Sequence, residues 1–257
     1  MELVVIGSGT AAPTADRTAP AHLVTTGNTR LLLDCGAGTL HRAASLGIPW
    51  SEITHVALTH FHMDHWGELP ALLFALRWGI EPARSEPLEL IGPVDLKARL
   101  AALTGALGDW VLEPGYPLTV TEIAPGSTLD LEDGVTLAAC KTPHTEHSVA
   151  YSVRDNNAFL VYTGDTGPST ELAEWARGCD LMLAECSLPD DRGIDVHLTP
   201  SSAGELARIA GARKLVLTHF YPVFGDSDPG VVAARAFGAA VEVAHDGARF
   251  HVESSPK

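Results

Sequence analysis

Four side chains of the types that bind metal ions occur within six residues. The segment Thr59–Gly67 reads T-H-F-H-M-D-H-W-G and follows an apolar stretch. His60 and His62 are two residues apart, so in an extended segment both project from the same side and can bind one metal ion. Asp64 and His65 fall where the chain turns into a helix, which directs them toward a second ion. The pattern predicts a two-metal site; the alternative is a surface histidine cluster in which Asp64 only caps the helix.

Three further candidate ligands stand at the ends of expected strands. His144 lies in a turn, with His147 as its nearest competitor for the same role. Asp165 lies in a glycine-containing turn, and His219 follows an apolar run. An acidic turn residue or a strand-end histidine is ordinary when taken alone. The interpretation of all three as ligands therefore rests on their order and spacing along the chain.

The elements that must position these side chains follow from the hydrophobic pattern. Alternating and β-branched runs predict strands at Glu2–Ile6, His22–Thr26, Arg30–Asp34, Ile53–Thr59, Val135–Lys141, Ser148–Val153, Phe159–Thr163, Leu181–Glu185 and Leu215–Thr218. Helical spacing predicts helices at Thr39–Leu46, His65–Leu76, Val94–Leu107, Thr170–Ala176 and Thr199–Ala210. This order indicates an α/β fold in which two sheets pack together with helices on both outer faces, an αββα sandwich.

The length of the chain suits one domain, which we expect to span residues 1–257. Residues from about 77 to 117 are rich in Pro, Gly and exposed-looking Trp, and they interrupt the sheet pattern. We interpret this segment as a cap or lid insert rather than a second domain.

Charge and composition exclude several classes of protein. The chain carries 17 basic and 32 acidic residues, a net charge of −15, which repels phosphate backbones and disfavours long nucleic acids as partners. No run approaches the roughly 20 apolar residues that span a bilayer, and the first residues lack the basic region of a signal peptide. We therefore expect a cytoplasmic protein without a membrane partner. The four cysteines form no C-x-x-C pair and are expected to be reduced thiols in the core.

The H-x-H-x-D-H motif resembles that of the metallo-β-lactamase superfamily, and within it the chain is most similar to ribonuclease Z and its relatives without the tRNA-binding arm. Supporting motifs are G-S-G-T-A-A-P-T at 7–14, D-C-G-A-G at 34–38, T-G-D-T at 163–166 and L-T-H-F at 217–220. The resemblance implies the metallo-β-lactamase fold, and it suggests a homodimer. It further implies that one metal ion is held by His60, His62 and His144, that the other is held by Asp64, His65 and His219, and that Asp165 bridges them.

The ligand set suits hydrolytic chemistry. Nitrogen and oxygen ligands favour two zinc ions, with manganese or iron as alternatives. The redox-active flavodiiron branch of the superfamily typically has glutamate at the position of His62, so hydrolysis is favoured over electron transfer. Two ions about 3.5 to 4 Å apart would lower the pKa of a bridging water. The nucleophile is then a metal-bridging hydroxide, and Asp64 is placed to orient it and accept its proton.

His197 is the candidate acid that protonates the leaving group. The segment V-H-L-T-P at 196–200 resembles the H-S-T motif of ribonuclease Z, with Leu198 in place of serine. The segment A-E-C-S at 184–187 lies where the family often has H-E-A-T, so Glu185 could orient His197, although Ala184 replaces the histidine of that motif. The alternative for His197 is a helix-capping or exposed histidine.

The segment between His144 and Asp165 is too short to contain a tRNA-binding arm, and this bears on the substrate class. In ribonuclease Z the tRNA-binding arm is inserted between the positions that match His144 and Asp165, which here are separated by only twenty residues. With the acidic charge, this favours a small-molecule ester, most of all a small phosphodiester, over precursor tRNA. The alternatives are an arylsulfatase, a lactonase, a tRNA 3′-processing endoribonuclease and a non-catalytic metal-binding protein. Arg17 and Arg77 are candidate anion-binding residues, but nothing in the sequence places either at the site.

Overall fold

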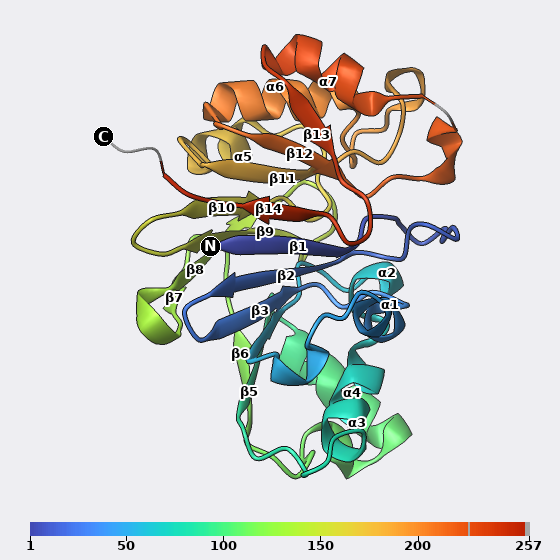
Figure 1. The fold of residues 1–257 in the computed structure, drawn as a ribbon, viewed down its shortest axis with the longest axis vertical. Helices are drawn as coiled ribbons and strands as arrows, with labels where there is room; N and C mark the ends of the chain where they lie inside the picture. The colour runs from blue at the N-terminus through green and yellow to red at the C-terminus, as the bar shows by residue number, and fades with distance from the viewer. Residues whose placement is uncertain (226, 255–257) are drawn as a thin grey trace.

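Two mixed sheets of seven strands stack face to face in the computed structural model, which describes residues 1–225 and 227–254. The first sheet has the order β14-β1-β2-β3-β4-β5-β6, and the second has the order β13-β12-β11-β10-β9-β8-β7. Helices α1, α3 and α4 lie against the outside of the first sheet, and α5, α6 and α7 cover the outside of the second (Figure 1). The expected αββα sandwich is confirmed.

The strands of the first sheet are β1 (Glu2–Gly7), β2 (Ala21–Thr26), β3 (Thr29–Leu33), β4 (His55–Ala57), β5 (Leu88–Gly92), β6 (Leu118–Glu122) and β14 (Arg249–His251). Those of the second are β7 (Thr128–Asp130), β8 (Thr136–Lys141), β9 (Val149–Arg154), β10 (Phe159–Tyr162), β11 (Leu181–Glu185), β12 (Leu215–Thr218) and β13 (Val241–Val243). The helices are α1 (Thr39–Ser45), α2 (Met63–Trp66), α3 (Leu69–Trp78), α4 (Leu96–Leu107), α5 (Thr170–Trp175), α6 (Pro200–Ala210) and α7 (Pro229–Phe237).

Three layers of buried apolar side chains hold the sandwich together. One lies between the two sheets, where residues such as Leu33 of β3 and Tyr151 of β9 meet. The other two lie between each sheet and its helices. Helix α3 shows the pattern: its residues Leu69, Leu72, Leu73 and Leu76 are fully buried at positions i, i+3, i+4 and i+7, which form one face of a helix. Truncating any of them to alanine costs about 2–5 kcal/mol in proteins of this kind.

The strands that matter for the site end at one edge of the sandwich. β3 and β4 are parallel neighbours in the first sheet, and β10, β11 and β12 are parallel neighbours in the second. Ligand sites in α/β sheets typically lie beyond the carboxyl ends of such strands. The residues at or just beyond the ends of these strands include Asp34, the segment Thr59–His65, Asp165, Glu185 and His219.

The expected helix His65–Leu76 is two helices in the structure. α2 begins at Met63 and ends at Trp66, and α3 begins at Leu69. Between them, the carboxylate of Glu68 accepts hydrogen bonds from the backbone N–H groups of Gly38 and Leu40, so the chain is tied to the start of α1. Pro70, in the first turn of α3, has no N–H to donate to a continuing helix.

The segment 77–117 was expected to interrupt the sheet pattern, but part of it belongs to the first sheet. Residues Leu88–Gly92 form β5, which lies inside that sheet and pairs in parallel with β4 and β6. The run P-L-E-L-I-G-P is short, so the sequence pattern could not separate a buried parallel strand from a loop. A capping role for the rest of this segment stays a prediction.

Two composition-based expectations can be compared with the structure directly. The cysteines Cys35, Cys140, Cys179 and Cys186 are all buried free thiols, as expected. Within residues 1–225 and 227–254, none of the helices has both the length and the apolar character needed to cross a bilayer.

Candidate metal centre

The metal-binding segment is anchored from the opposite sheet. The hydroxyl of Tyr151 donates to the carbonyl oxygen of Leu58 at 2.8 Å, and the backbone N–H of Val149 donates to that of Thr59 at 3.0 Å. These bonds hold the end of β4 against β9, so the following histidines leave the sheet edge in a defined direction. His62 is extended and occupies the N-cap position of α2, while Asp64 lies in the first turn. Asp64 is therefore not the helix cap of the alternative interpretation.

Four side chains form the first ligand group. His60 and His62 come from the segment after β4, His144 from the turn after β8, and Asp165 from the turn after β10. Their ligand atoms all lie within 4.8 Å of one another. His144 Nε2 is 3.1 Å from His62 Nδ1 and 3.5 Å from Asp165 Oδ2, and His60 Nε2 is 3.8 Å from the same oxygen.

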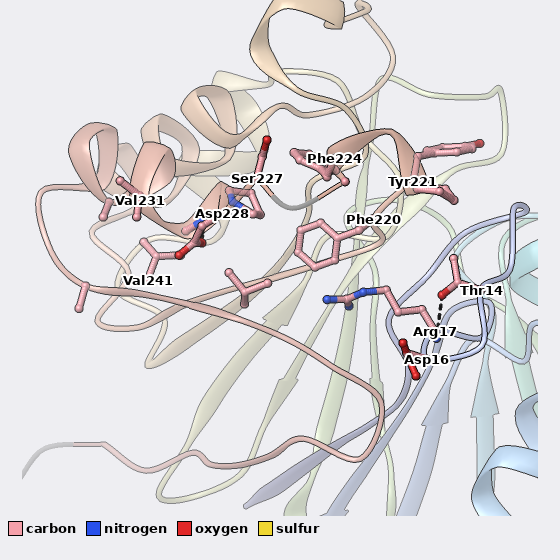
Figure 2. Close-up of a pocket in the computed structure, with 17 residues that line it drawn as sticks. Thr14, Asp16, Arg17, Phe220, Tyr221, Phe224, Ser227, Asp228, Val231 and Val241 are labelled. Carbon is pink, nitrogen blue, oxygen red and sulfur yellow. Dashed lines mark hydrogen bonds between the residues drawn. The ribbon is translucent and has the colours of Figure 1, made fainter.

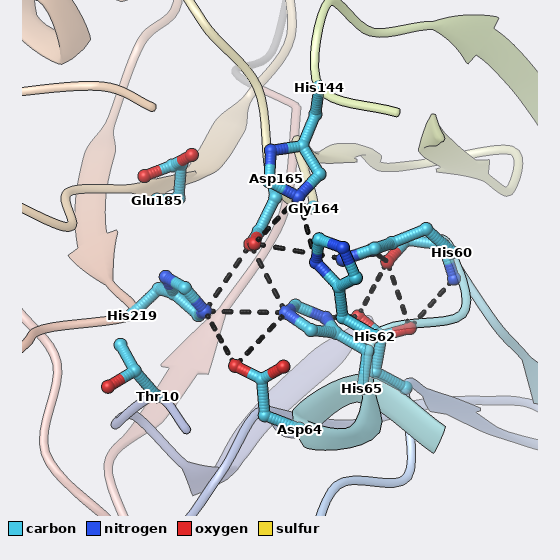
Figure 3. Close-up of polar contacts among 12 residues, drawn as sticks. Thr10, His60, His62, Asp64, His65, His144, Gly164, Asp165, Glu185 and His219 are labelled. Atoms are coloured by element: carbon cyan, nitrogen blue, oxygen red, sulfur yellow. Dashed lines mark hydrogen bonds and ion pairs between the residues drawn. The ribbon is translucent and has the colours of Figure 1, made fainter. Parts of the chain in front are cut away.

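Three side chains form the second ligand group, namely Asp64, His65 and His219. The Nε2 atoms of His65 and His219 are 3.3 Å apart, and Asp64 Oδ2 lies 3.9 and 3.5 Å from them. His219 has a left-handed backbone, with φ of 63°, which histidine adopts more readily than most residues. This turn at the end of β12 points the imidazole into the cluster rather than along the strand (Figure 3).

Asp165 belongs to the first group and also faces the second. Its Oδ2 points toward His60 and His144, whereas its Oδ1 is 3.2 Å from His65 Nε2 and 3.4 Å from His219 Nε2 (Figure 3). Asp165 Oδ1 and His60 Nε2 are buried and have no hydrogen-bond partner among the described residues. Unpartnered buried polar atoms are costly, and a cation between them would satisfy both. The residues present therefore fit metal ions.

The Nδ1 atoms of three candidate ligand histidines make hydrogen bonds that orient their rings. Asp34 Oδ2 accepts from His65 Nδ1 at 2.8 Å, and the carbonyl of Val196 accepts from His144 Nδ1 at 3.0 Å. His60 Nδ1 pairs with the hydroxyl of Thr59 at 3.0 Å. Such bonds fix the ring orientation and leave the other nitrogen as the ligand atom.

Asp34 supports the candidate site, and the sequence pattern did not predict this. Its carboxylate is fully buried and accepts hydrogen bonds from His65, from the hydroxyl of Tyr162 at 2.8 Å and from the backbone N–H of Thr59 at 2.7 Å. It also has a left-handed backbone, with φ of 59°. Asp34 directly follows a buried strand, and an acidic residue at such a position is a sequence feature from which its role could have been predicted.

Close backbone approach at this edge requires glycine. Gly164, with φ of +53°, lies so near Thr59 that an added Cβ would be 2.9 Å from the threonine side chain. At Gly36 an added Cβ would be 1.9 Å from the carbonyl oxygen of Asp64. The first contact joins two ligand-bearing turns, and the second joins the turn that follows Asp34 to the one that carries Asp64. A larger residue at either position would push the turns apart.

A second polar chain runs beside the cluster. His197 Nδ1 is 2.8 Å from Glu185 Oε1, and the buried hydroxyl of Ser187 donates to Glu185 Oε2 at 2.6 Å. The same hydroxyl lies 2.8 Å from His219 Nδ1. His197, Asp165 and His219 also offer ligand atoms within 4.8 Å of one another. Because Glu185 occupies Nδ1 of His197, this imidazole is better placed for proton transfer than as a ligand through that nitrogen.

The charges of the cluster are arranged for a cation. Burial raises the pKa of Asp165, but the facing His219 and His65 outweigh burial and bring it well below its ordinary value. Burial lowers the pKa of His60 well below its ordinary value, and the neighbouring His65 lowers it further. A buried ionised carboxylate beside a neutral imidazole is the state in which both bind metal ions.

The other sequence candidates fall outside the two groups. His147 is half-buried, its ring lies 6.2 Å from that of Phe61, and it belongs to neither ligand group. Arg77 lies on α3, where it stacks on Trp78 and donates to the carbonyl of Glu113. Arg17 lines a separate cavity next to the cluster.

A model of the family described as "Beta-lactamase superfamily domain" matches residues 29–220, a range that contains both ligand groups. The chain belongs to the β-lactamase superfamily. Curated members that resemble it include proteins named Ribonuclease Z from Mycobacterium bovis (strain BCG / Pasteur 1173P2), 30% identical over 273 residues and 96% of each chain, and from Mycobacterium marinum, 30% identical over 281 residues and 99% of each chain.

Two solved structures share the fold. The metallo-beta-lactamase fold protein YhfI from Bacillus subtilis superposes with a TM-score of 0.84 at 24% identity, over 97% of this chain and 98% of the other. The short form of human tRNase Z superposes with a TM-score of 0.81 at 23% identity, over 99% and 100%. The superfamily assignment and the His/Asp cluster identify the protein as a metal-dependent hydrolase.

Proposed function

We propose that this superfamily member is a phosphodiesterase that cleaves a small phosphodiester with two metal ions, preferably zinc. In this proposal His60, His62 and His144 hold one ion, Asp64, His65 and His219 hold the other, and Asp165 bridges them. The observation that carries the two-ion assignment is the orientation of Asp165, whose two oxygens face different histidine pairs. One tetrahedral ion uses four ligands, so seven are more than a single site needs.

The protein side chains then divide the work of ester hydrolysis. When bound, two divalent ions would lower the pKa of water and neutralise charge on the ester oxygens. Asp64, only partly buried in the second group, is placed to orient the attacking water and accept its proton. His197 donates a proton to the leaving oxygen, and Glu185 holds the ring of His197 and stabilises its protonated form.

The small size of the proposed substrate is supported by the segment between His144 and Asp165. It forms a turn and the hairpin of β9 (Val149–Arg154) and β10 (Phe159–Tyr162), both of which belong to the second sheet. The resemblance places a tRNA-binding arm in this interval, and the hairpin leaves no residues for one. The net charge of −15 acts in the same direction, because a long polyanion is repelled.

A second candidate function is 3′ processing of precursor tRNA. It is favoured by the curated relatives named Ribonuclease Z, which are about 30% identical over nearly the full chain.

The cytoplasmic location, the homodimer and the single-domain boundary stay predictions from the sequence.

The test combines elemental analysis of the purified protein with a panel of substrates. The panel contains bis-nitrophenyl phosphate, an alkyl phosphodiester, an aryl sulfate, a lactone, a β-lactam and precursor tRNA at low salt. We expect two ions per chain and turnover of the phosphodiesters. Efficient, position-specific 3′ cleavage of precursor tRNA would overturn the small-substrate proposal, and faster turnover of the sulfate or lactone would overturn the phosphodiester class.

A further inference from the structure

A cavity of about 890 Å³ lies beside the metal centre, between the loop that carries Thr14 and Arg17 and the layer formed by α7 and β13 (Figure 2). Its volume is in the range of small-molecule sites, roughly 300 to 1,000 Å³. Tyr221 connects it to the metal centre, because Tyr221 lines the cavity and its ring lies 6.2 Å from that of the candidate ligand His219. A substrate with its ester at the metal ions could extend one group into this space.

The wall of the cavity suits a flat ring. Phe220 and Phe224 are buried residues that line it, and Val241 and Val243 of β13 form the adjoining surface. Aromatic and aliphatic side chains of this kind stabilise planar ligands by stacking and by removing apolar surface from water.

Arg17 is held rigidly at the edge of this wall. Its Nη1 donates to the hydroxyl of Ser8 at 2.6 Å and to the carbonyl of Ala244 at 2.7 Å, and the guanidinium lies over the Phe220 ring at 4.7 Å. Among the described residues, Nε and Nη2 of Arg17 have no hydrogen-bond partner, and neither atom is buried. The Nε–Nη2 edge is therefore a fixed pair of donors that a ligand with two adjacent acceptors can meet.

The charges of the cavity exclude a simple anion. Asp16 and Asp228 also line it, so among the described lining residues two carboxylates accompany one guanidinium. Asp228 Oδ1 accepts from the backbone N–H of Gly230 at 2.8 Å, and no bond within the described chain is found for its other oxygen. A neutral planar ring that offers acceptors to Arg17 and donors to a carboxylate matches this set better than a second negative charge does.

We propose that the cavity binds a purine base, with guanine as the best match. Guanine presents the adjacent acceptors O6 and N7, which an arginine meets with two hydrogen bonds. Its N1–H and N2–H2 groups, on the edge that adjoins O6, are donors from which a carboxylate can accept. This inference rests on the proposed function, because the base is then the part of the phosphodiester next to the ester that the metal ions hold.

The test is calorimetric titration of the purified, metal-loaded protein with guanosine 5′-monophosphate, cytidine 5′-monophosphate and ribose 5-phosphate. Ribose 5-phosphate reports phosphate binding at the metal ions alone. We expect guanosine monophosphate to bind about tenfold or more tightly than either control. Only this ligand both offers two adjacent acceptors to Arg17 and places a purine ring on the apolar wall. Equal affinity for guanosine monophosphate and ribose 5-phosphate would overturn the inference.

Three variants locate the base. Arg17→Met removes the donor pair, and Val231→Trp, at an exposed lining position of α7, places an indole in the space for the base and keeps Arg17. Both should reduce the affinity for guanosine monophosphate to that for ribose 5-phosphate. The matched control Arg77→Met removes an arginine that also stacks on an aromatic ring, but on α3, and should leave binding unchanged. Because Arg17 also holds Ser8, Val231→Trp decides the matter if Arg17→Met does not fold.

The two proposals fail in different ways. Base binding that Val231→Trp removes, in a protein that hydrolyses no phosphodiester, would overturn the proposed function and support the cavity assignment. Phosphodiester hydrolysis in a protein whose affinity for guanosine monophosphate is unaffected by Val231→Trp would overturn the cavity assignment alone.

Discussion

His197 Nδ1 lies 2.8 Å from Glu185 Oε1, a buried carboxylate oxygen at the end of β11. Burial lowers the pKa of His197, but the hydrogen bond and the charge of Glu185 outweigh burial and raise the pKa above its ordinary value. A histidine with a raised pKa holds its proton to higher pH than an ordinary imidazole does. Because His197 also lies 4.0 Å from the central Asp165, it is suited to act as a general acid.

His197→Ala should damage the turnover of an alkyl phosphodiester far more than that of a bis-nitrophenyl ester. A nitrophenolate leaves without a proton, whereas an alkoxide does not, and general acid catalysis typically contributes 10² to 10⁴ in rate. Steady-state kinetics on both substrates checks this, with elemental analysis to show that the metal ions remain. His147→Ala is the matched control, since His147 lies outside both ligand groups. Equal losses on the two substrates would argue for a positioning role instead.

Glu185→Gln should shift the pH dependence of the same reaction. The acid is active when His197 is protonated, so the rate falls as the pH rises through the pKa of His197. Glutamine keeps the shape of the side chain but removes the charge that raises this pKa. The alkaline limb of the profile for an alkyl phosphodiester is therefore expected to move to lower pH. An unchanged limb would show that His197 does not set it.

Asp165→Ala should weaken both metal sites together. The two oxygens of Asp165 face different ligand groups, so its removal takes one ligand from each. Elemental analysis after dialysis is expected to show loss of both ions. The control is Asp155→Ala in the turn between β9 and β10, which removes an acidic residue that belongs to neither ligand group. Two tightly bound ions and normal activity in Asp165→Ala would contradict the bridging assignment.

Asp34→Asn tests the support behind His65. Asparagine keeps the size of the side chain but lacks the charge that accepts from His65 Nδ1 and Tyr162. Loss of such a supporting partner typically costs about 10- to 100-fold in metal affinity. Competition with a chelator measures the affinity. Tyr162→Phe removes only one donor to the intact carboxylate and is expected to have a smaller effect; a larger effect than that of Asp34→Asn would contradict this account.

His22 should make the protein less stable in acid. It is fully buried with neither ring nitrogen partnered among the described residues, and burial lowers its pKa from 6.5 to about 3. Below pH 6.5 the unfolded chain therefore binds a proton that the folded chain does not bind until about pH 3, so stability falls as the pH falls through this window. Between pH 7 and pH 5 this group contributes a loss of about 2 kcal/mol.

The variant His22→Leu isolates this contribution. Leucine fills the site without polar atoms, so the free energy of unfolding at pH 7 should be unchanged or higher. Denaturant unfolding at pH 7 and pH 5 should show a smaller loss in the variant than in the natural protein. An equal loss in both proteins would mean that His22 is not held neutral in the folded state.

The candidate ligands were open to prediction because their chemistry is local. His60, His62, Asp64 and His65 fall within one turn after a strand, and the spacing alone shows which of them share a side. The sandwich was likewise visible in the alternation of the strands. The helix break at Gly67 and Glu68 was not, because the carboxylate of Glu68 bonds to Gly38 and Leu40, about thirty residues earlier in the chain.

What only the tertiary structure decided depends on contacts between distant segments. The sequence pattern of β5 does not distinguish it from a loop, and its pairing with β4 and β6 on both sides makes it a strand. Arg17 is one exposed-looking cation among many in the sequence, and it becomes a fixed donor pair only because Ala244 and Ser8 hold its guanidinium over Phe220. Asp34 gains its role in the same way, from His65 and from Tyr162 of the opposite sheet. Local spacing determines which side chains can bind the same metal ion, whereas the packing of two sheets determines which buried partners orient those side chains.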